Sequence, residues 1–257
     1  MMRIQILYED REKVILYKPA GLATQSAKVT QADAVSELKN YLKGGYVGVV
    51  HRLDQPVEGL LLFAKTPAAA KRYSGALQEG TLNKEYLAVC CGSPEGWRAT
   101  GDADGAGNAG DETAAGSAFT RGHTLVEPAG GGYRLTTCLK KESGKGGAVA
   151  VATTAEDPEG KRCVLEIRAL QHREDCTLLR VTLLTGRFHQ IRAQLSDAGI
   201  PLLGDEKYGS PESRETSAKY GVRTVALCAD RLTVPGKGGE PEREIEIKPN
   251  GTAFAIF

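Results

Sequence analysis

The amino-acid sequence predicts an α+β fold, in which short strands and a few helices share a hydrophobic core. Three observations support this prediction. The 257 residues are 41% hydrophobic and 25% charged, which suits one large or two small globular domains. Residues 163–170 and 177–184 alternate apolar and polar side chains, as half-buried antiparallel strands do. Residues 30–42 and 66–79 instead carry helix signals.

The first half of the chain alternates strands and helices. Residues 4–8 and 14–18 are strand-like runs around a charged turn, which indicates a hairpin. In 30–42 the apolar residues Val35, Leu38 and Leu42 fall at helical spacing, before two glycines. The next helix should start at Thr66-Pro67, with Thr as the N-cap, and end near Gly80. Residues 83–89 then return as a strand.

The second half ends in shorter elements. A short helix should carry His189 and Arg192 on neighbouring positions and end at Gly199, because Ile191 and Leu195 lie four residues apart. Residues 200–208 are a turn-rich loop and are followed by a polar connection. Two strands, at 224–228 and 244–247, complete the expected order.

Two segments are poor in large apolar residues. Residues from Pro94 to about Gly132 are rich in Gly, Ala, Asp and Thr. Such a segment buries too little apolar area to offset its ordering entropy, so we expect a flexible surface insertion at about 94–132 within one domain spanning 1–257. A second weak segment covers 144–160.

The net charge, the cysteine spacing and the length of the apolar stretches limit the kinds of partner and cellular location that we expect. With 33 basic and 32 acidic residues the net charge is +1, so a nucleic-acid partner would have to be held by local clusters of Lys and Arg. The six cysteines show no metal-site or disulfide spacing, and no apolar stretch approaches the roughly 20 residues that cross a bilayer. We therefore expect reduced thiols, no metal and a cytoplasmic protein without a membrane partner.

The most suggestive stretch runs from His51 to Gly59, between two apolar runs. It places His51, Arg52 and Asp54 in one short loop on a buried scaffold, a common position for reactive groups. A carboxylate among basic groups stays ionised, as a nucleophile must. A structural ion pair or a turn-capping Asp is the alternative interpretation of Asp54.

A second cluster follows residue 186. Arg187, His189, Gln190 and Arg192 place two guanidiniums, an imidazole and an amide within two helical turns. These groups suit binding of an anion or of a base edge, and a salt-bridged surface helix is the alternative. No glycine-rich phosphate-binding motif follows a strand, so the sequence indicates no nucleotide cofactor.

Three blocks resemble the RluA-type pseudouridine synthases, which isomerise uridine in ribosomal and transfer RNA. The blocks occur in the family's order, together with an early turn at Lys18-Pro19-Ala20-Gly21. They are His51-Arg52-Leu53-Asp54 with the run to Lys65, then residues 84–89, and then 185–192 with 199–209. The resemblance implies a mixed, largely antiparallel sheet with flanking helices and a central catalytic cleft, and no cofactor or metal.

The resemblance also implies roles. Asp54 matches the nucleophile, which attacks the uracil ring or the ribose. Arg52 matches the side chain that holds the target nucleotide out of its helix, and Tyr86 the tyrosine that stacks on the flipped base. Arg192 or Arg187 would pair with Asp54. His51, His189 and Gln190 would complete the substrate-binding set.

Four positions depart from the family's usual pattern. Val57 and Glu58 replace a usual Thr-Ser pair, Phe188 replaces Thr or Ser, and Cys228 replaces a common His. Glu58 is expected to put negative charge near a site that approaches phosphates. We also expect no N-terminal RNA-binding domain, no obligate protein partner and a monomer.

Two other functions fit the residues less well. A catalytically silent RNA-binding or ribosome-assembly protein on the same fold is the main alternative, motivated by Glu58 and Phe188. An Asp-dependent glycosidase is weaker, because such enzymes use two carboxylates and Glu58 is the sole nearby candidate in the sequence. The sequence leaves open the choice between ribosomal and transfer RNA, and the target uridine.

Overall fold

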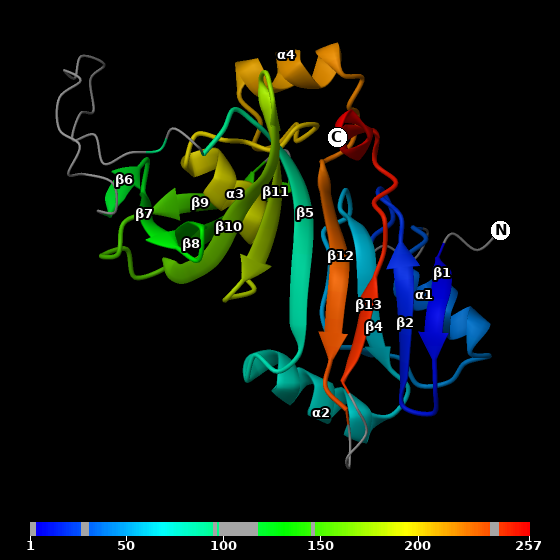
Figure 1. Ribbon diagram of the computed structural model, residues 1–257. Helices are drawn as coiled ribbons and strands as arrows, with labels where there is room; N and C mark the ends of the chain where they lie inside the picture. Colours follow the sequence, from blue (N-terminus) through cyan, green and yellow to red (C-terminus); the bar gives the residue numbers. More distant parts are fainter. Residues whose placement is uncertain (1–3, 27–30, 95–96, 98–117, 145–146, 237–241) are drawn as a thin grey trace, which may run out of the picture. The chain divides into compact units, whose positions relative to one another are not determined.

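The computed structural model describes residues 4–26, 31–94, 97, 118–144, 147–236 and 242–257. The chain divides into two compact units (Figure 1). Unit 1 comprises Met1–Leu87 and Val222–Ile256, and unit 2 comprises Ala88–Gly221 with the last residue. The division falls within strand β5 (Asn83–Cys91). The single catalytic domain expected from the sequence stays a prediction.

Unit 1 is built on a mixed sheet. Its strands lie in the order β1-β2-β4-β12-β5, with β3 beside β4 and β13 beside β12. Strand β4 pairs in parallel with β12, whereas β1 with β2, β2 with β4, and β12 with β13 are antiparallel. The predicted first hairpin is therefore confirmed. The strands other than β5 are β1 (Gln5–Glu9), β2 (Lys13–Lys18), β3 (Gly48–Val49), β4 (Glu58–Ala64), β12 (Leu227–Val234) and β13 (Arg243–Glu246).

Gly59 allows β4 and β12 to approach closely. Its φ is +130°, and a Cβ built on it would lie 2.5 Å from the backbone nitrogen and oxygen of Ala229. Any side chain there would clash with backbone atoms that cannot move alone. Glycine at this position therefore sets the start of β4, directly after the loop that carries Asp54.

Two helices of unit 1 follow their sequence signals. Helix α1 (Ala34–Tyr41) begins after Asp33, whose carboxylate caps the backbone N–H of Ser36. Helix α2 (Pro67–Gln78) begins as predicted after Thr66, whose hydroxyl accepts from the N–H of Ala69 over 3.1 Å. Tyr73 of α2 is buried in a core with apolar side chains of β2, β4 and β12. Burial of one helix face thus fixes α2 on this sheet.

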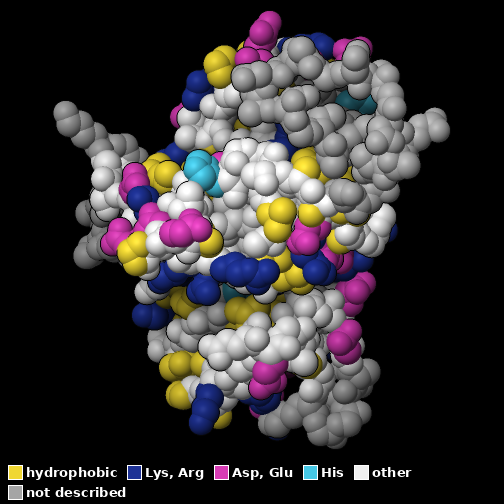
Figure 2. Space-filling view, turned by 90° about the vertical axis from the view of Figure 1, so that its left-hand side faces the viewer, with side chains coloured by type: hydrophobic (Ala, Val, Ile, Leu, Met, Phe, Trp, Pro, Cys, Tyr) yellow, Lys and Arg dark blue, Asp and Glu magenta, His cyan; other side chains and the backbone are white. Residues whose placement is uncertain are grey.

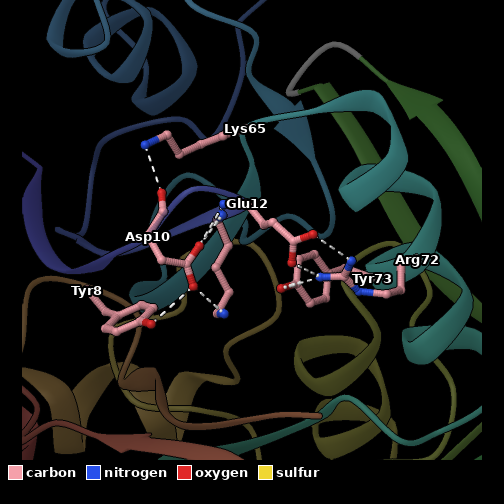
Figure 3. A network of polar contacts seen from close by, with 7 residues as sticks. Tyr8, Asp10, Glu12, Lys65, Arg72 and Tyr73 are labelled. Carbon is pink, nitrogen blue, oxygen red and sulfur yellow. Dashed lines mark hydrogen bonds and ion pairs between the residues drawn. The ribbon is translucent and has the colours of Figure 1, made fainter. Parts of the chain in front are cut away.

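A polar network holds the turn between β1 and β2 (Figure 3). The Asp10 carboxylate accepts from the ammonium of Lys13 over 2.6 Å and from two backbone N–H groups of the turn. Arg72 of α2 binds both carboxylate oxygens of Glu12, over 3.1 and 2.6 Å. Lys65 donates to the backbone oxygen of Asp10 over 2.8 Å. The network therefore joins the hairpin to the end of β4 and to α2.

Unit 2 is built on an antiparallel sheet in the order β11-β10-β8-β7-β6, with β9 paired to β8. The two predicted strands at 163–170 and 177–184 lie within β10 and β11, which form an antiparallel pair as expected. Helix α3 packs its Ala193 against Leu139, Ala150 and Cys163. The elements are β6 (Phe119–Arg121), β7 (Thr124–Ala129), β8 (Gly132–Gly144), β9 (Gly147–Thr153), β10 (Lys161–Arg173), β11 (Cys176–Leu183), α3 (Gln190–Asp197) and α4 (Pro211–Lys219).

The weak segments contain more structure than expected. Residues 118–132 form β6, β7 and the start of β8, and 147–153 form β9. Gly130 and Gly131, with φ of +54° and +80°, make the two-residue turn between β7 and β8, so these glycines mark a tight hairpin. The rest of the predicted insertion, 95–96 and 98–117, lies outside the described residues.

Two further elements differ from the prediction. Helix α4 occupies the expected polar connection and is capped by Ser210 before Pro211, a signal of the same kind as Thr66-Pro67. Strand β12 begins at Leu227, close to the end of the predicted strand, and runs on through the charged Asp230 and Arg231. The α+β class with a mixed sheet is confirmed.

Charge is distributed in local groups. Figure 2 shows close groups of Lys and Arg side chains on one face, with acidic and hydrophobic side chains exposed between them. This pattern matches the near-zero net charge of the chain. Among the described residues, no helix has the length and apolar character needed to span a membrane.

Candidate functional site

The turn that carries Asp54 precedes β4. The N–H of Val57 donates to the backbone oxygen of Asp54 over 3.1 Å, which closes a turn around Gln55 and Pro56. Before it, His51 and Leu53 are buried, whereas Arg52 is exposed and Asp54 is half-buried. The loop thus alternates the buried His51 and Leu53 with the two side chains predicted to act on substrate.

Thr24 fixes the residue before Asp54. Its buried hydroxyl donates to the backbone oxygen of Leu53 over 2.8 Å and accepts from the N–H of Leu53 over 3.0 Å. One side chain therefore satisfies both backbone groups of Leu53, which holds the backbone at Asp54 without a regular strand.

Lys18 supports the other side of the turn. Its side chain is fully buried, and its ammonium donates to the backbone oxygens of Leu22, Pro19 and Gln55 over 2.7, 3.0 and 3.3 Å. Burial lowers the pKa of Lys18 to about 8, against the opposing effects of Asp54 and Glu58. The buried ammonium of Lys18 therefore joins the turn after β2 to the turn that carries Asp54.

Tyr86 and Lys84 come from one face of β5. Burial, followed by the charge of Asp54, raises the pKa of Tyr86 above its ordinary value. The tyrosine is thus within electrostatic range of the carboxylate and keeps its proton at neutral pH. Burial also lowers the pKa of Lys84 to about 8, although its side chain retains some exposure to solvent. Unit 1 therefore places Tyr86 near Asp54, and Arg52 lies two residues before Asp54 on the same loop.

His51 is buried and faces the sheet. Its Nε2 accepts from the N–H of Leu62 over 3.2 Å, so this nitrogen carries no proton. Burial, followed by the nearby charge of Lys84, lowers the pKa of His51 well below its usual value. A neutral, buried imidazole bonded to β4 holds the loop and offers no positive charge to a phosphate.

Glu58 is also buried, and its carboxylate is fully engaged. It accepts from the hydroxyl of Tyr17 over 2.5 Å and from the N–H of Gly251 over 2.8 Å. The N–H of Asn250 donates to it as well, over 3.2 Å. The side chain is therefore buried and anchors the C-terminal segment, and the expected effect of its charge on approaching phosphates stays a prediction.

In unit 2, Gln190 is buried and organises the loop before α3. Its amide oxygen accepts from the hydroxyl of Thr185 over 2.9 Å and from the N–H of Arg187 over 3.0 Å. Its amide nitrogen donates to the backbone oxygen of Val164 over 3.1 Å. The side chain of Arg187 is exposed, and Gln190 holds the backbone that presents it.

Arg192 is buried and clamped by Asp205. Its Nε and Nη2 donate to the two carboxylate oxygens over 2.7 and 2.8 Å. The guanidinium also lies 5.0 Å from the ring centroid of Tyr208. These contacts fix the plane of the Arg192 guanidinium. Asp54 belongs to unit 1, so its pairing with Arg192 or Arg187 stays a prediction.

His189 bonds to the same tyrosine. Its Nδ1 lies 2.7 Å from the hydroxyl of Tyr208, and its ring stacks on Phe188 with centroids 3.7 Å apart. Cys228 lies buried on β12 opposite Glu58.

Sequence reasoning did not assign roles to Lys18, Thr24, Asp205 or Tyr208. Lys18, Asp205 and Tyr208 lie inside the blocks that carry the resemblance, which is a signal that could have found them. Thr24 has no such signal, because its contact with Leu53 spans 29 residues. Within the described ranges, no group of three or more His, Cys, Asp or Glu side chains could hold a metal ion.

Comparison with solved structures supports the fold. The chain is similar to the human RNA pseudouridylate synthase domain containing 4 protein, with a TM-score of 0.65 and 20% identity over 95% of this chain and 88% of that one. For the human domain containing 1 protein the TM-score is 0.67, with 18% identity over 96% of this chain and 84% of that one.

Sequence comparison identifies the family. The chain is 30% identical over 211 residues to ribosomal large subunit pseudouridine synthase D of Yersinia pestis, covering 80% of this chain and 53% of that protein. It is 30% identical over 246 residues to synthase C of Rickettsia conorii, covering 95% and 67%. The chain thus spans about half to two-thirds of the length of these relatives. The RNA pseudouridylate synthase family profile matches residues 12–197, and the chain belongs to that family.

Proposed function

We propose that this chain isomerises uridine in RNA to pseudouridine, with Asp54 as the nucleophile. The observation that carries the proposal is the half-buried Asp54, on a turn fixed by Thr24 and Lys18 and within electrostatic range of Tyr86. A carboxylate held in one position suits attack on a substrate that is itself held in place. The family membership of the chain supports the same reaction.

The proposed steps need no oxidant, reductant or cofactor. Asp54 attacks the uracil ring or the ribose and forms a covalent bond to it, and the bond between base and sugar breaks. The base rotates, a carbon–carbon bond to the sugar forms, and the bond to Asp54 breaks, which returns the free carboxylate. A proton leaves the ring carbon that joins the sugar, and the freed ring nitrogen gains one. Tyr86 keeps its hydroxyl proton, so it can donate a hydrogen bond or stack on the base.

The other predicted site residues divide by exposure. Arg52 and Arg187 are exposed, which suits contact with a flipped nucleotide or its phosphates. His51 and Gln190 are buried and bonded to backbone groups, so we assign them to holding the two loops. His189 also acts through its neighbours and is treated below.

For the substrate, we favour large-subunit ribosomal RNA over transfer RNA. The two relatives quoted above are both named ribosomal large subunit pseudouridine synthases. The expectation that the chain acts in the cytoplasm as a monomer, without an obligate protein partner, stays a prediction.

Tritium release tests the reaction directly. Ribosomal RNA carrying tritium at uracil carbon 5, from cells that lack this gene, should lose tritium to water when the protein is added. Asp54→Asn should lower the rate by at least about 1,000-fold, because a carboxamide is a poor nucleophile. Asp10→Asn is a matched control in the network of Figure 3 and should keep activity.

The outcomes separate the two candidate functions. An active Asp54→Asn protein would refute the nucleophile. A wild-type protein that binds this RNA but releases no tritium, and leaves 5-fluorouridine-containing RNA unchanged, would favour the silent RNA-binding protein.

A further inference from the structure

Phe188 is an exposed aromatic ring on a rigid support. Its side chain is 37% exposed, in the loop that also carries Arg187. The ring of His189 stacks on it, with an interplanar angle of 20° and centroids 3.7 Å apart.

Three residues hold the ring that supports Phe188: His189 itself, Tyr208 and Ala150. His189 has φ of +51°, a left-handed conformation that non-glycine residues rarely adopt. Its ring is held by the hydroxyl of Tyr208, which also accepts from the N–H of Ala150 on β9 over 2.7 Å. The imidazole is therefore fixed in place as a backing for Phe188.

The ammonium group of a lysine lies over the face of the Phe188 ring. The ammonium of Lys141, an exposed residue of β8, lies 5.0 Å from the Phe188 ring centroid. A cation–π contact at an exposed site is weak, and the Lys141 ammonium is carried on a flexible side chain. Another group can therefore replace the ammonium on the ring. The loop also presents the exposed Arg187.

We propose that Phe188 and Lys141 form a stacking site for an unstacked base of single-stranded RNA. The base takes the position of the ammonium on the Phe188 ring, and Lys141 moves to a neighbouring phosphate. His189 and Tyr208 are positioning residues for this site. The proposal rests on the proposed function for its ligand, and adds a contact to an RNA base.

The chemistry favours RNA over a peptide. An aromatic ring next to flexible cations matches the pairing of base and phosphate in a single strand. Phe188 alone is a small apolar surface, and flanking cations add nothing to the docking of an apolar peptide. A base inside a duplex is already stacked on both faces, so the site selects unpaired nucleotides.

Tryptophan fluorescence gives a direct test. Phe188→Trp places a reporter in the site, and wild-type protein, whose one tryptophan Trp97 is buried, is the blank. A five-nucleotide oligouridine should quench the emission that Phe188→Trp adds over wild type, whereas an RNA duplex of the same length should quench it much less. Equal quenching by both, or none by the oligouridine, would overturn the site.

Binding of the same oligouridine by the Phe188 variants completes the test. Phe188→Ala should weaken the affinity for the oligouridine about 5- to 100-fold, the range for loss of one stacked base. Phe188→Tyr should keep most of that affinity. Lys141→Gln should weaken binding a few-fold and reduce its salt dependence. Leu170→Ala, a change at another exposed apolar residue of unit 2, and Lys161→Gln serve as controls and should have no effect.

Activity distinguishes this proposal from the proposed function. If wild-type protein releases tritium, Phe188→Ala should raise KM with little change in kcat. If wild-type protein is inactive, the oligouridine results still decide the stacking site. Phe188→Ala protein that keeps its unfolding temperature and binds oligouridine like wild type would overturn the inference.

Discussion

The hydroxyl of Tyr17 donates a hydrogen bond of 2.5 Å to the carboxylate of Glu58, a residue 41 positions later. The same carboxylate receives the backbone N–H groups of Asn250 and Gly251. Strand β2, the start of β4 and the C-terminal segment thus meet at one buried side chain. A position that departs from the family pattern has therefore become a structural anchor.

Loss of this anchor should destabilise the C-terminal segment. Glu58→Ala leaves buried donors without an acceptor and should lower the free energy of unfolding by about 3 kcal/mol. Tyr17→Phe removes one donor and should cost about 1 kcal/mol. Urea unfolding measures both, and limited proteolysis should cut residues 247–256 faster in Glu58→Ala. Equal stability of Glu58→Ala and wild type would contradict the role of the carboxylate.

Thr24 should matter for activity through the backbone of Leu53. Thr24→Val keeps the shape but removes both hydrogen bonds, so we expect a loss of about 1–3 kcal/mol in stability. Misplacement of Asp54 should lower kcat about ten- to hundredfold, measured by tritium release. Thr136→Val is the matched control, because the structure describes no hydrogen-bond partner for that buried hydroxyl. An unchanged kcat in Thr24→Val would show that Leu53 needs no such support.

Lys18 makes stability depend on pH in the alkaline range. Its pKa in the folded protein is about 8, below the value of about 10.4 for an unfolded chain. Between these values the unfolded chain binds more protons, so the stability contributed by Lys18 rises with pH. Relative to Lys18→Met, wild type should gain about 1–2 kcal/mol between pH 8 and 9.5.

Urea unfolding of both proteins at pH 7, 8.5 and 9.5 checks this prediction. Other groups that titrate in this range, Lys84 among them, are present in both proteins and cancel in the difference. A difference that stays constant over these pH values would mean that Lys18 does not titrate there.

Asp10 should contribute stability that acid removes. Burial would raise its pKa, but hydrogen bonds from Lys13 and the turn lower it to about 2, below the ordinary 3.8. The stabilisation is therefore present above about pH 4 and is lost as the pH falls through 2. Asp10→Asn should lower the free energy of unfolding by about 1–2 kcal/mol at pH 7. Near pH 2 the two proteins should be equally stable, and a difference that persists there would exclude this cause.

Local signals predicted some elements well. Thr66-Pro67 marked the start of α2, and the alternating residues of β10 and β11 marked an antiparallel pair. Helix α4 carries the same kind of signal at Ser210-Pro211, but few large apolar residues mark a buried face. The glycines of 130–131 make a turn, and the strands beside them, β7 and β8, gain stability from pairing with each other, which composition alone does not show.

The candidate site divides in the same way. Arg52, Asp54 and Tyr86 could be singled out because each lies in a block with a recognisable local pattern, and their roles stay predictions. The roles of Lys18 and Thr24 were not, because they depend on contacts 29 to 37 residues away along the chain. The structural role of Glu58 was not predictable for the same reason: its partners at 250 and 251 lie nearly 200 residues later.

The clamp between Arg192 and Asp205 has a consequence for how the sequence can vary. Replacing either residue alone leaves its partner charged and buried, at a cost of about 3–5 kcal/mol. Replacing both together with a neutral pair avoids that cost. In a library that randomises both codons, variants with a replacement at only one of the two positions should therefore be depleted among the folded clones. Variants with a neutral pair at both positions should be retained.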